Sequence, residues 1–150
     1  MTIQGIPASV VGISSHPSLY FFSMTRVAVA ILRRNGKLMV CQRRKGDRYA
    51  LKWEFPGGKI EPGETILGCL ERELYEELSI RITAVGRVES AISHYDDGGL
   101  FEVAYCHVSS FEGELQNNVF HEIRWVSPNE LASMDVLEGN AEIIARLARP

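Results

Sequence analysis

Residues 57–80 read GGKIEPGETILGCLERELYEELSI and place a glycine turn before a segment with helical periodicity. At about 100° per residue, a helix from Glu64 to Leu78 aligns four leucines on one narrow stripe. These are Leu67, Leu70, Leu74 and Leu78. Such a stripe is typical of a helix packed against a core. The segment therefore predicts an amphipathic helix over residues 64–78, buried along one side.

Three glutamates lie beside this stripe. Glu73, Glu76 and Glu77 share an arc of roughly 100°, although like charges at these spacings cost about 0.2–0.5 kcal/mol per pair. The helix dipole also disfavours negative charge in the last turns. On an arbitrary helix such residues form a solvated acidic face. The other interpretation is a site for Mg²⁺, which prefers oxygen ligands, keeps some waters and bridges to phosphates.

The whole segment resembles the signature of the Nudix hydrolases, G-x5-E-x7-R-E-U-x-E-E-x-G-U, in which U is aliphatic. The matching residues are Gly58, Glu64, Arg72, Glu73, Leu74, Glu76, Glu77 and Ile80. Ser79 is the single departure, because the family has glycine there. A residue just past a helix end normally takes a left-handed conformation, which costs a non-glycine residue on the order of 1 kcal/mol. Ser79 therefore affects how the helix ends rather than the metal chemistry.

The resemblance covers residues 25–148 and is tightest over residues 53–80. It implies an α/β fold, the Nudix fold, in which a mixed, curved β-sheet is sandwiched between α-helices. We expect this domain to span residues 25–150. The stretch WEFPGGK, residues 53–59, is most similar to the MutT-like branch. That branch hydrolyses nucleoside triphosphates to monophosphate and pyrophosphate.

The resemblance also implies roles for individual residues. The ligands of Mg²⁺, for which Mn²⁺ is expected to substitute, would be Glu73, Glu77, the Gly57 carbonyl and, further along the chain, Glu122. Glu76 is a further candidate ligand. The bound cation would neutralise phosphate charge and activate a water, and a nearby carboxylate would take the proton from that water. For Glu122, an exposed position at a strand edge is the alternative.

Two further residues of the signature have open roles. Arg72 lies one turn before Glu76 and is expected to hold the carboxylates in place by i,i+4 pairing, with direct phosphate contact as the alternative. Glu64 is a candidate general base, a partner of the metal ligands, or an acid placed favourably at a helix N-terminus.

Basic and glycine residues around the signature are candidate substrate contacts. The cluster Arg43, Arg44, Lys45 and Arg48 is either a solvated loop or a docking site for a polyphosphate, which arginine grips bidentately. Gly58 and Lys59 are expected at the same site, because glycine lets a ligand approach the backbone closely. Phe55 is expected to lie against a base or to pack in the core.

Asn140 resembles the asparagine that MutT-like enzymes place against the nucleobase. Its amide offers a donor and an acceptor, which suits a purine edge, whereas a helix N-cap is the alternative. The resemblance implies an oxidised guanine nucleotide such as 8-oxo-dGTP, and hence nucleotide-pool sanitation and DNA repair. Gly98-Gly99 departs from the residues often found in that turn, so a pyrimidine triphosphate (CTP or dCTP) or a broad set of nucleotides stays open.

An alternative from another class is a nucleotide-binding sensor without catalysis. The intact Arg72, Glu73, Glu76 and Glu77 argue against it, since a binding module has no need of the full cation site.

Local patterns predict the remaining elements. Strands are expected at residues 26–32 and 37–43, joined by an Asn35-Gly36 hairpin turn, and at residues 80–93, 100–110 and 119–126. Residues 127–130, SPNE, are a capping box with proline at the first helical position. Residues 137–147 predict an amphipathic helix that directs Ile143, Ile144 and Leu147 inward.

Length and composition indicate one globular domain. The chain has 150 residues, and its net charge of −3 argues against a nucleic-acid polymer as partner. Three widely spaced cysteines do not suit a disulfide framework or a zinc site, and we expect them to be reduced and half-buried. No apolar run approaches the roughly 18 residues of a membrane span. We therefore expect a cytoplasmic monomer or homodimer that binds a small nucleotide.

Residues 1–24 have no clear periodicity. One interpretation is that translation starts at Met24. The alternative is a real N-terminal extension, which would either pack as an edge element or be disordered. The four histidines, His16, His94, His107 and His121, are scattered and are expected to be ordinary surface or core residues.

Overall fold

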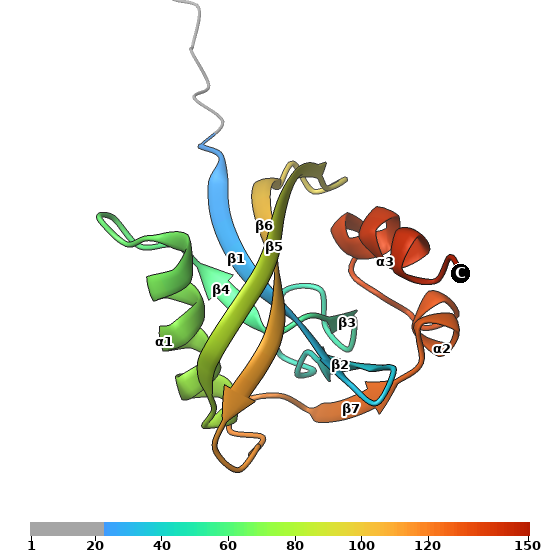
Figure 1. Ribbon diagram of the computed structural model, residues 1–150. Helices are drawn as coiled ribbons and strands as arrows, with labels where there is room; N and C mark the ends of the chain where they lie inside the picture. The colour runs from blue at the N-terminus through green and yellow to red at the C-terminus, as the bar shows by residue number, and fades with distance from the viewer. Residues whose placement is uncertain (1–22) are drawn as a thin grey trace, which may run out of the picture.

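The structure is a computed structural model that describes residues 23–150, shown in Figure 1. The prediction for residues 1–24 and that for His16 therefore lie almost wholly outside the described residues. Within residues 23–150 the strands form a seven-stranded sheet in the order β3-β2-β1-β6-β5, with β4 paired to β1 and β7 to β2. β1 and β6 run parallel, whereas the other pairs are antiparallel, so the sheet is mixed as predicted.

The bounds of the elements are as follows. The strands are β1 (Thr25–Arg34), β2 (Lys37–Gln42), β3 (Trp53–Glu54), β4 (Gly57–Lys59), β5 (Arg81–His94), β6 (Leu100–Glu112) and β7 (Glu122–Val126). The helices are α1 (Ile66–Leu78), α2 (Pro128–Ala132), the 3₁₀ turn η1 (Glu138–Asn140) and α3 (Ala141–Leu147).

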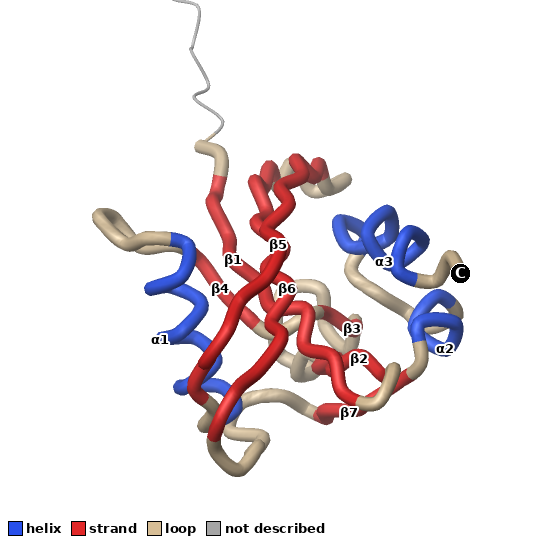
Figure 2. Tube along the Cα trace, viewed as in Figure 1, coloured by secondary structure: helices blue, strands red, loops and turns tan. Residues whose placement is uncertain are grey.

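The sheet separates two hydrophobic cores. Successive side chains of a strand point to opposite faces, so β1 contributes Val29 and Ile31 to one core and Ala28, Ala30 and Leu32 to the other. The first core is closed by α2 and α3, and the second by α1. Figure 2 shows α1 on one side of the strands and α2 and α3 on the other. The predicted sheet between helices is confirmed.

The β1–β2 hairpin forms as its sequence predicts. Asn35 and Gly36 both take positive φ, 50° and 74°, and the strands pair through Arg34 and Lys37. Positive φ at both central residues defines a type I′ turn, whose twist matches that of the flanking strands.

Helix α1 begins later than predicted. Its N-cap is Thr65, whose hydroxyl accepts from the Gly68 N–H at 3.0 Å, so Glu64 lies before the helix. The buried stripe consists of Cys69, Leu70, Leu74 and Leu78. Leu67 was wrongly included, because it is 46% exposed. Helical side chains lean toward the N-terminus, so that of Leu67 projects past the first turn.

The end of α1 agrees with the expectation for Ser79. This residue takes the left-handed conformation, with φ 58° and ψ 27°. The Asn118 side chain donates to Ser79 Oγ at 2.9 Å and to the Glu76 carbonyl at 3.0 Å. These hydrogen bonds offset part of the cost of a non-glycine residue at this position.

Other predicted elements need adjustment at their ends. The last strand starts at Glu122 rather than at residue 119, and the predicted helix over residues 137–147 is divided into η1 and α3. Ile143 and Ile144 are buried as expected, and Leu147 packs against the same core while half-buried. The capping box of α2 is present, with hydrogen bonds between Ser127 and Glu130 in both directions.

Cys41, Cys69 and Cys106 are free thiols and are completely buried rather than half-buried. Each serves as a small core residue. None of the helices within residues 23–150 is long and apolar enough to cross a membrane.

Candidate active site

A cleft of about 500 Å³ gathers residues from distant parts of the chain. It is bounded by β1, β4, β6, the C-terminal half of α1, the loop after β2 and the η1 turn. Many residues predicted to form the site line it: Arg43, Arg44, Phe55, Gly57, Gly58, Lys59, Glu77 and Asn140. The folded chain therefore brings acidic, basic and amide groups together around one space.

Glu77 is one of the acidic residues that line this cleft, together with Asp47 and Glu54. Its Oε2 accepts from the Gly57 N–H at 3.1 Å, which ties the end of α1 to β4. Burial, and then the negative charge of Glu73, raise the pKa of the Glu77 carboxyl to about 9. An acid in this state binds a proton at neutral pH unless a cation takes the place of that proton.

The two glycines of β4 are required by close packing. Gly57 has φ 148°, and a Cβ there would lie 2.1 Å from the Ala28 carbonyl oxygen. A Cβ on Gly58 would lie 2.2 Å from Glu73 Oε1. Only glycine fits against the backbone at residue 57, and a side chain at residue 58 would displace the Glu73 carboxylate. The two glycines thus let β4 approach β1 on one side and the acidic face of α1 on the other.

Arg72 clamps the other carboxylates of the signature. It donates to both oxygens of Glu64, at 2.8 and 2.9 Å, and to Glu73 Oε1 at 2.8 Å. The expected i,i+4 partner, Glu76, is more distant at 3.6 Å and has a 57% exposed side chain. Arg72 therefore does hold the carboxylates, but mainly Glu64 and Glu73. Its hydrogen bonds to Glu64 lower the pKa of that carboxyl to about 2.

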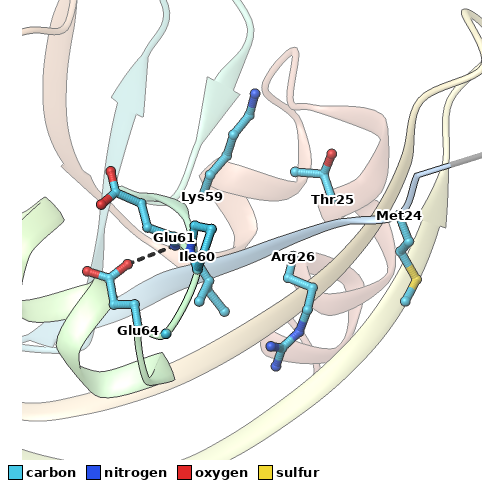
Figure 3. A pocket seen from close by; sticks show the side chains of 9 residues that line it. Met24, Thr25, Arg26, Lys59, Ile60, Glu61 and Glu64 are labelled. Atoms are coloured by element: carbon cyan, nitrogen blue, oxygen red, sulfur yellow. Dashed lines mark hydrogen bonds between the residues drawn. The ribbon is translucent and has the colours of Figure 1, made fainter.

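Glu64 does not line the 500 Å³ cleft. It borders a shallower pocket of about 340 Å³ between the start of β1 and the loop before α1, shown in Figure 3. There its Oε2 also accepts from the Glu61 N–H at 3.0 Å, drawn as a dashed line. Lys59 borders both spaces. Of the roles open to Glu64, these contacts favour that of a partner which supports Arg72.

The signature carboxylates offer the oxygen ligands that a hard cation prefers, although in this structure they form hydrogen bonds with protein groups instead. Within residues 23–150 no three His, Cys, Asp or Glu side chains converge as a ready-made metal cage. Glu73 accepts a hydrogen bond from Arg72, and Glu77 accepts one from the Gly57 N–H. Their ligand atoms are all oxygen. Burial, and then the negative charge of Glu73, raise the pKa of Glu77, and a divalent cation would offset both effects by stabilising the ionised carboxylate. The residues present therefore fit a magnesium ion.

Glu122 lies apart from these groups. It pairs with Arg124 on the same strand at 2.5 and 3.0 Å, and its side chain is 40% exposed. Glu122 does not line the cleft. This placement corresponds to the exposed strand-edge alternative, and no contact in the described residues links Glu122 to Glu73 or Glu77.

The basic residues after β2 differ in whether they form ion pairs. Arg43 pairs with Glu54 at 3.0 Å, and Arg48 pairs with Asp97 at 2.6 Å. Lys45 does not line the cleft. Arg44 and Lys59 line it and form no ion pair within the described residues. These two cations are therefore the ones available to the phosphates of a substrate.

Asn140 does not cap α3 with its side chain. It occupies the N-cap position, as the alternative expects, but its side chain makes no cap hydrogen bond. Asn140 Oδ1 instead lies 3.0 Å from the Tyr105 hydroxyl. The residue is 7% exposed, and among the described residues it is the one amide or charged residue that is buried. A buried amide at the wall of a cleft is well placed to bind a ligand.

Aromatic residues also line the cleft. Phe55 is 2% exposed and packs edge-on against Tyr105 with ring centroids 6.5 Å apart, so it is a core residue that also borders the cleft. Tyr49 stacks on Tyr95 at 4.8 Å, and Phe101 meets Tyr95 edge-on. Tyr49, Tyr95 and Phe101, together with Tyr105, were not predicted from the sequence to belong to the site. Tyr95 and Phe101 flank the β5–β6 turn, but only strand pairing shows that this turn faces the cleft. Tyr49 lies in the loop after β2 and Tyr105 lies within β6.

The histidines take ordinary positions, as expected for the three that are described. His107 Nε2 lies 3.0 Å from Glu89 Oε1, away from the cleft lining. His94 and His121 are exposed.

Comparison with known proteins identifies the class. A family model described as the NUDIX domain matches residues 24–147. The chain is 37% identical over 132 residues to the CTP pyrophosphohydrolase of Escherichia coli K12, covering 85% of this chain and 97% of that relative. It is 33% identical over 125 residues to the 8-oxo-dGTP diphosphatase of the same strain, covering 83% and 96%. The solution structure of the E. coli ORF135 protein superposes with a TM-score of 0.72 at 34% identity, covering 85% of this chain and 94% of that one.

The fold and the site therefore define a hydrolase of the nucleotide pool. The chain belongs to the Nudix hydrolase family, in its MutT-like branch. Enzymes of this family generally use divalent metal ions and act on small nucleotides.

Proposed function

We propose that this enzyme hydrolyses a nucleoside triphosphate to a monophosphate and pyrophosphate in a Mg²⁺-dependent reaction. The observation that carries the proposal is the single cleft that combines Glu77, the cations Arg44 and Lys59, and the buried amide of Asn140. Negative phosphate groups and a polar base edge are the two features of a nucleotide that these groups bind. Such a substrate fits a chain of net charge −3 better than a nucleic-acid polymer does.

The ligands of the metal would be Glu73, Glu77 and the Gly57 carbonyl. When bound, Mg²⁺ supplies charge neutralisation at the phosphates and a lowered pKa for a bound water. Arg72 keeps Glu73 oriented, and Glu64 in turn holds Arg72 through two hydrogen bonds. Glu64 stays ionised and paired at neutral pH because its pKa is about 2, which argues for this supporting role over that of general base.

The remaining groups bind the substrate and move its proton. Arg44 and Lys59 bind phosphate oxygens at the wall of the cleft. Glu76, with its exposed side chain next to the clamp of Arg72, accepts the proton of the attacking water. Arg43 is held by Glu54 and positions the loop that carries Arg44. We assign these functions to a domain of residues 25–150 that works in the cytoplasm as a monomer or homodimer.

The base is proposed to be an oxidised guanine, as in 8-oxo-dGTP, because the amide of Asn140 lies in the cleft and an 8-oxo-dGTP diphosphatase is a relative over nearly its whole length. Cytosine is the second candidate. It is favoured by the relationship to a CTP pyrophosphohydrolase, which is 37% identical.

The experiment that tests the proposal is pyrophosphate release from 8-oxo-dGTP, dGTP, CTP, dCTP and ADP-ribose, with Mg²⁺ or with chelator. We expect pyrophosphate from triphosphates in Mg²⁺ and none in chelator. Hydrolysis that continues in chelator would exclude the metal mechanism. Binding of these nucleotides without turnover would instead support a sensor.

A further inference from the structure

The η1 turn is attached to the sheet by three hydroxyl groups. The Gly139 N–H donates to the Tyr95 hydroxyl at 3.1 Å, and Ser93 Oγ donates to the Gly139 carbonyl at 3.3 Å. The Tyr105 hydroxyl lies 3.0 Å from the same carbonyl. A Cβ on Gly139 would lie 2.5 Å from the Tyr95 hydroxyl, so only glycine allows this approach. These contacts fix the backbone of Asn140, the next residue.

The Tyr105 hydroxyl faces two acceptors with one proton. It lies 3.0 Å from the Gly139 carbonyl oxygen and 3.0 Å from Asn140 Oδ1. A phenolic hydroxyl has a single proton to donate and lone pairs to accept with. Tyr105 is 1% exposed, so bulk water does not reach its side chain. The hydroxyl therefore donates to one of the two oxygens at a time.

Two arrangements satisfy all of these groups. In the first, Tyr105 donates to Asn140 Oδ1, and the Gly139 carbonyl keeps its hydrogen bond from Ser93. In the second, Tyr105 donates to the Gly139 carbonyl, and its oxygen accepts from Asn140 Nδ2. The second needs only a rotation of the amide by about 180°, which exchanges oxygen and nitrogen with little change in shape.

The two arrangements present opposite groups to the cleft. Within residues 23–150 no buried side-chain nitrogen or oxygen lacks a partner, so the amide group turned away from Tyr105 is accessible from the cleft. In the first arrangement Nδ2 is a donor and suits a base carbonyl such as guanine O6. In the second Oδ1 is an acceptor and suits an exocyclic amine such as cytosine N4.

We infer that Tyr105 is a specificity-determining positioning residue, whose hydroxyl lets one asparagine recognise both carbonyl-bearing and amine-bearing bases. The inference rests on the proposed hydrolysis of nucleoside triphosphates. Ser93 biases the choice, because its hydrogen bond to the Gly139 carbonyl is needed in the first arrangement and dispensable in the second. A residue that does not touch the base therefore influences which base is preferred.

The variant Ser93→Ala tests this direction. Without the Ser93 hydroxyl, the Gly139 carbonyl depends on the Tyr105 proton, so the amide turns its oxygen to the cleft. The ratio of kcat/KM for dCTP to that for 8-oxo-dGTP should rise about 3- to 10-fold, the worth of one hydrogen bond. A merely structural role would change both substrates by the same factor. Ser90→Ala, at an exposed position of the same strand, is the control.

The variant Tyr105→Phe completes a double-mutant cycle. In that background, Ser93→Ala should leave the ratio unchanged, because the shared proton is absent. Calorimetric binding of dCMP and 8-oxo-dGMP without metal gives the same ratios independently of turnover. An unchanged ratio in Ser93→Ala, or an equal shift in the Tyr105→Phe background, overturns the inference. If the binding ratios shift but no triphosphate is hydrolysed, only the proposed reaction fails.

Discussion

The Gly57 N–H donates to Glu77 Oε2 at 3.1 Å and so joins β4 to the last turns of α1. The same helix carries Glu73, whose carboxylate lies where a Cβ of Gly58 would be. The two adjacent glycines thus bring two carboxylates against one short strand. This arrangement concentrates negative charge at the wall of the cleft, which is the reason for placing the cation there.

Replacement of Glu77 by glutamine should reduce turnover while the fold survives. The amide keeps an acceptor for the Gly57 N–H but lacks the charge that holds a cation, so kcat should fall on the order of 100-fold or more. Pyrophosphate release in Mg²⁺ measures the loss. Glu71→Gln, an exposed position on the same helix, is the matched control and should keep normal activity. Near-normal rates in Glu77→Gln would remove Glu77 from the metal site.

The same variant should be more stable than the natural protein in chelator. The pKa of Glu77 rises from its ordinary 4.5 to about 9 in the fold, so the folded state binds a proton that the unfolded state has released. The free energy of unfolding should therefore fall as pH rises from 4.5 toward 9. Because one pKa unit corresponds to about 1.4 kcal/mol, the loss at pH 8 should be on the order of a few kcal/mol. The glutamine in Glu77→Gln does not ionise, so this variant should not show that loss of stability.

Thermal unfolding from pH 4 to 9 in chelator measures the effect. The Tm of Glu77→Gln should match that of the natural protein near pH 4 and exceed it increasingly at higher pH. Added Mg²⁺ should narrow the gap by stabilising only the protein that keeps Glu77. A constant difference in Tm across this range would show that Glu77 is not the titrating group.

Asn140→Ala should change base preference with little loss of stability. The side chain makes no cap hydrogen bond to α3, and the Tyr105 hydroxyl keeps the Gly139 carbonyl as an acceptor. We expect the ratio of kcat/KM between 8-oxo-dGTP and dCTP to shift by about 10-fold or more, the worth of a base contact, because these two bases offer different groups to the amide. Asn129→Ala, exposed in α2, is the control. A uniform loss on every base would indicate that Asn140 only supports the fold.

The parts of the site that lie on one helix could be predicted from the sequence. Spacing along α1 places Arg72 beside Glu73 and Glu76, and the helix end at Ser79 takes the left-handed conformation that its position requires. Leu67 was misplaced because helical periodicity alone does not show where the buried surface ends. Local rules hold where neighbouring residues determine the contact.

Contacts between distant segments could not be predicted in this way. Tyr105 meets Asn140 across 35 residues and Arg48 meets Asp97 across 49, and both depend on how β5 and β6 pair and end. Glu122 illustrates the same limit. Its place after the signature fitted a metal ligand, but its register opposite Gln42 and its pair with Arg124 place it on an exposed edge.

Arg72→Lys should lower kcat more than it raises KM. Lysine keeps the charge but cannot donate to both oxygens of Glu64 and to Glu73 at once, since that requires the fork of a guanidinium. Glu73 would then be less well oriented, and we expect kcat to fall about 10-fold or more. Arg124→Lys disrupts a similar arginine–glutamate pair outside the cleft and serves as control. If KM alone rises, Arg72 contacts the phosphates directly instead.

Asp97 should control substrate affinity through the loop after β2. It accepts hydrogen bonds from Arg48 at 2.6 and 2.9 Å and from the Tyr49 hydroxyl at 2.8 Å. Tyr49 and Leu51 hold positive φ values of 58° and 61°, a costly conformation for such residues. Asp97 therefore stabilises a strained loop that carries Arg44 and stacks Tyr49 on Tyr95 at the edge of the cleft.

Asp97→Ala should release this loop without touching Glu77 or Arg72. We expect KM to rise about 10-fold, since one immobilising ion pair and its hydrogen bonds are lost, while kcat stays within about twofold. Amide hydrogen exchange of residues 44–52 should accelerate in parallel. Asp96→Ala removes the neighbouring exposed carboxylate and should change neither quantity. If exchange accelerates but KM does not move, the loop does not position Arg44 for the phosphates, and the proposed phosphate contact must come from Lys59 alone.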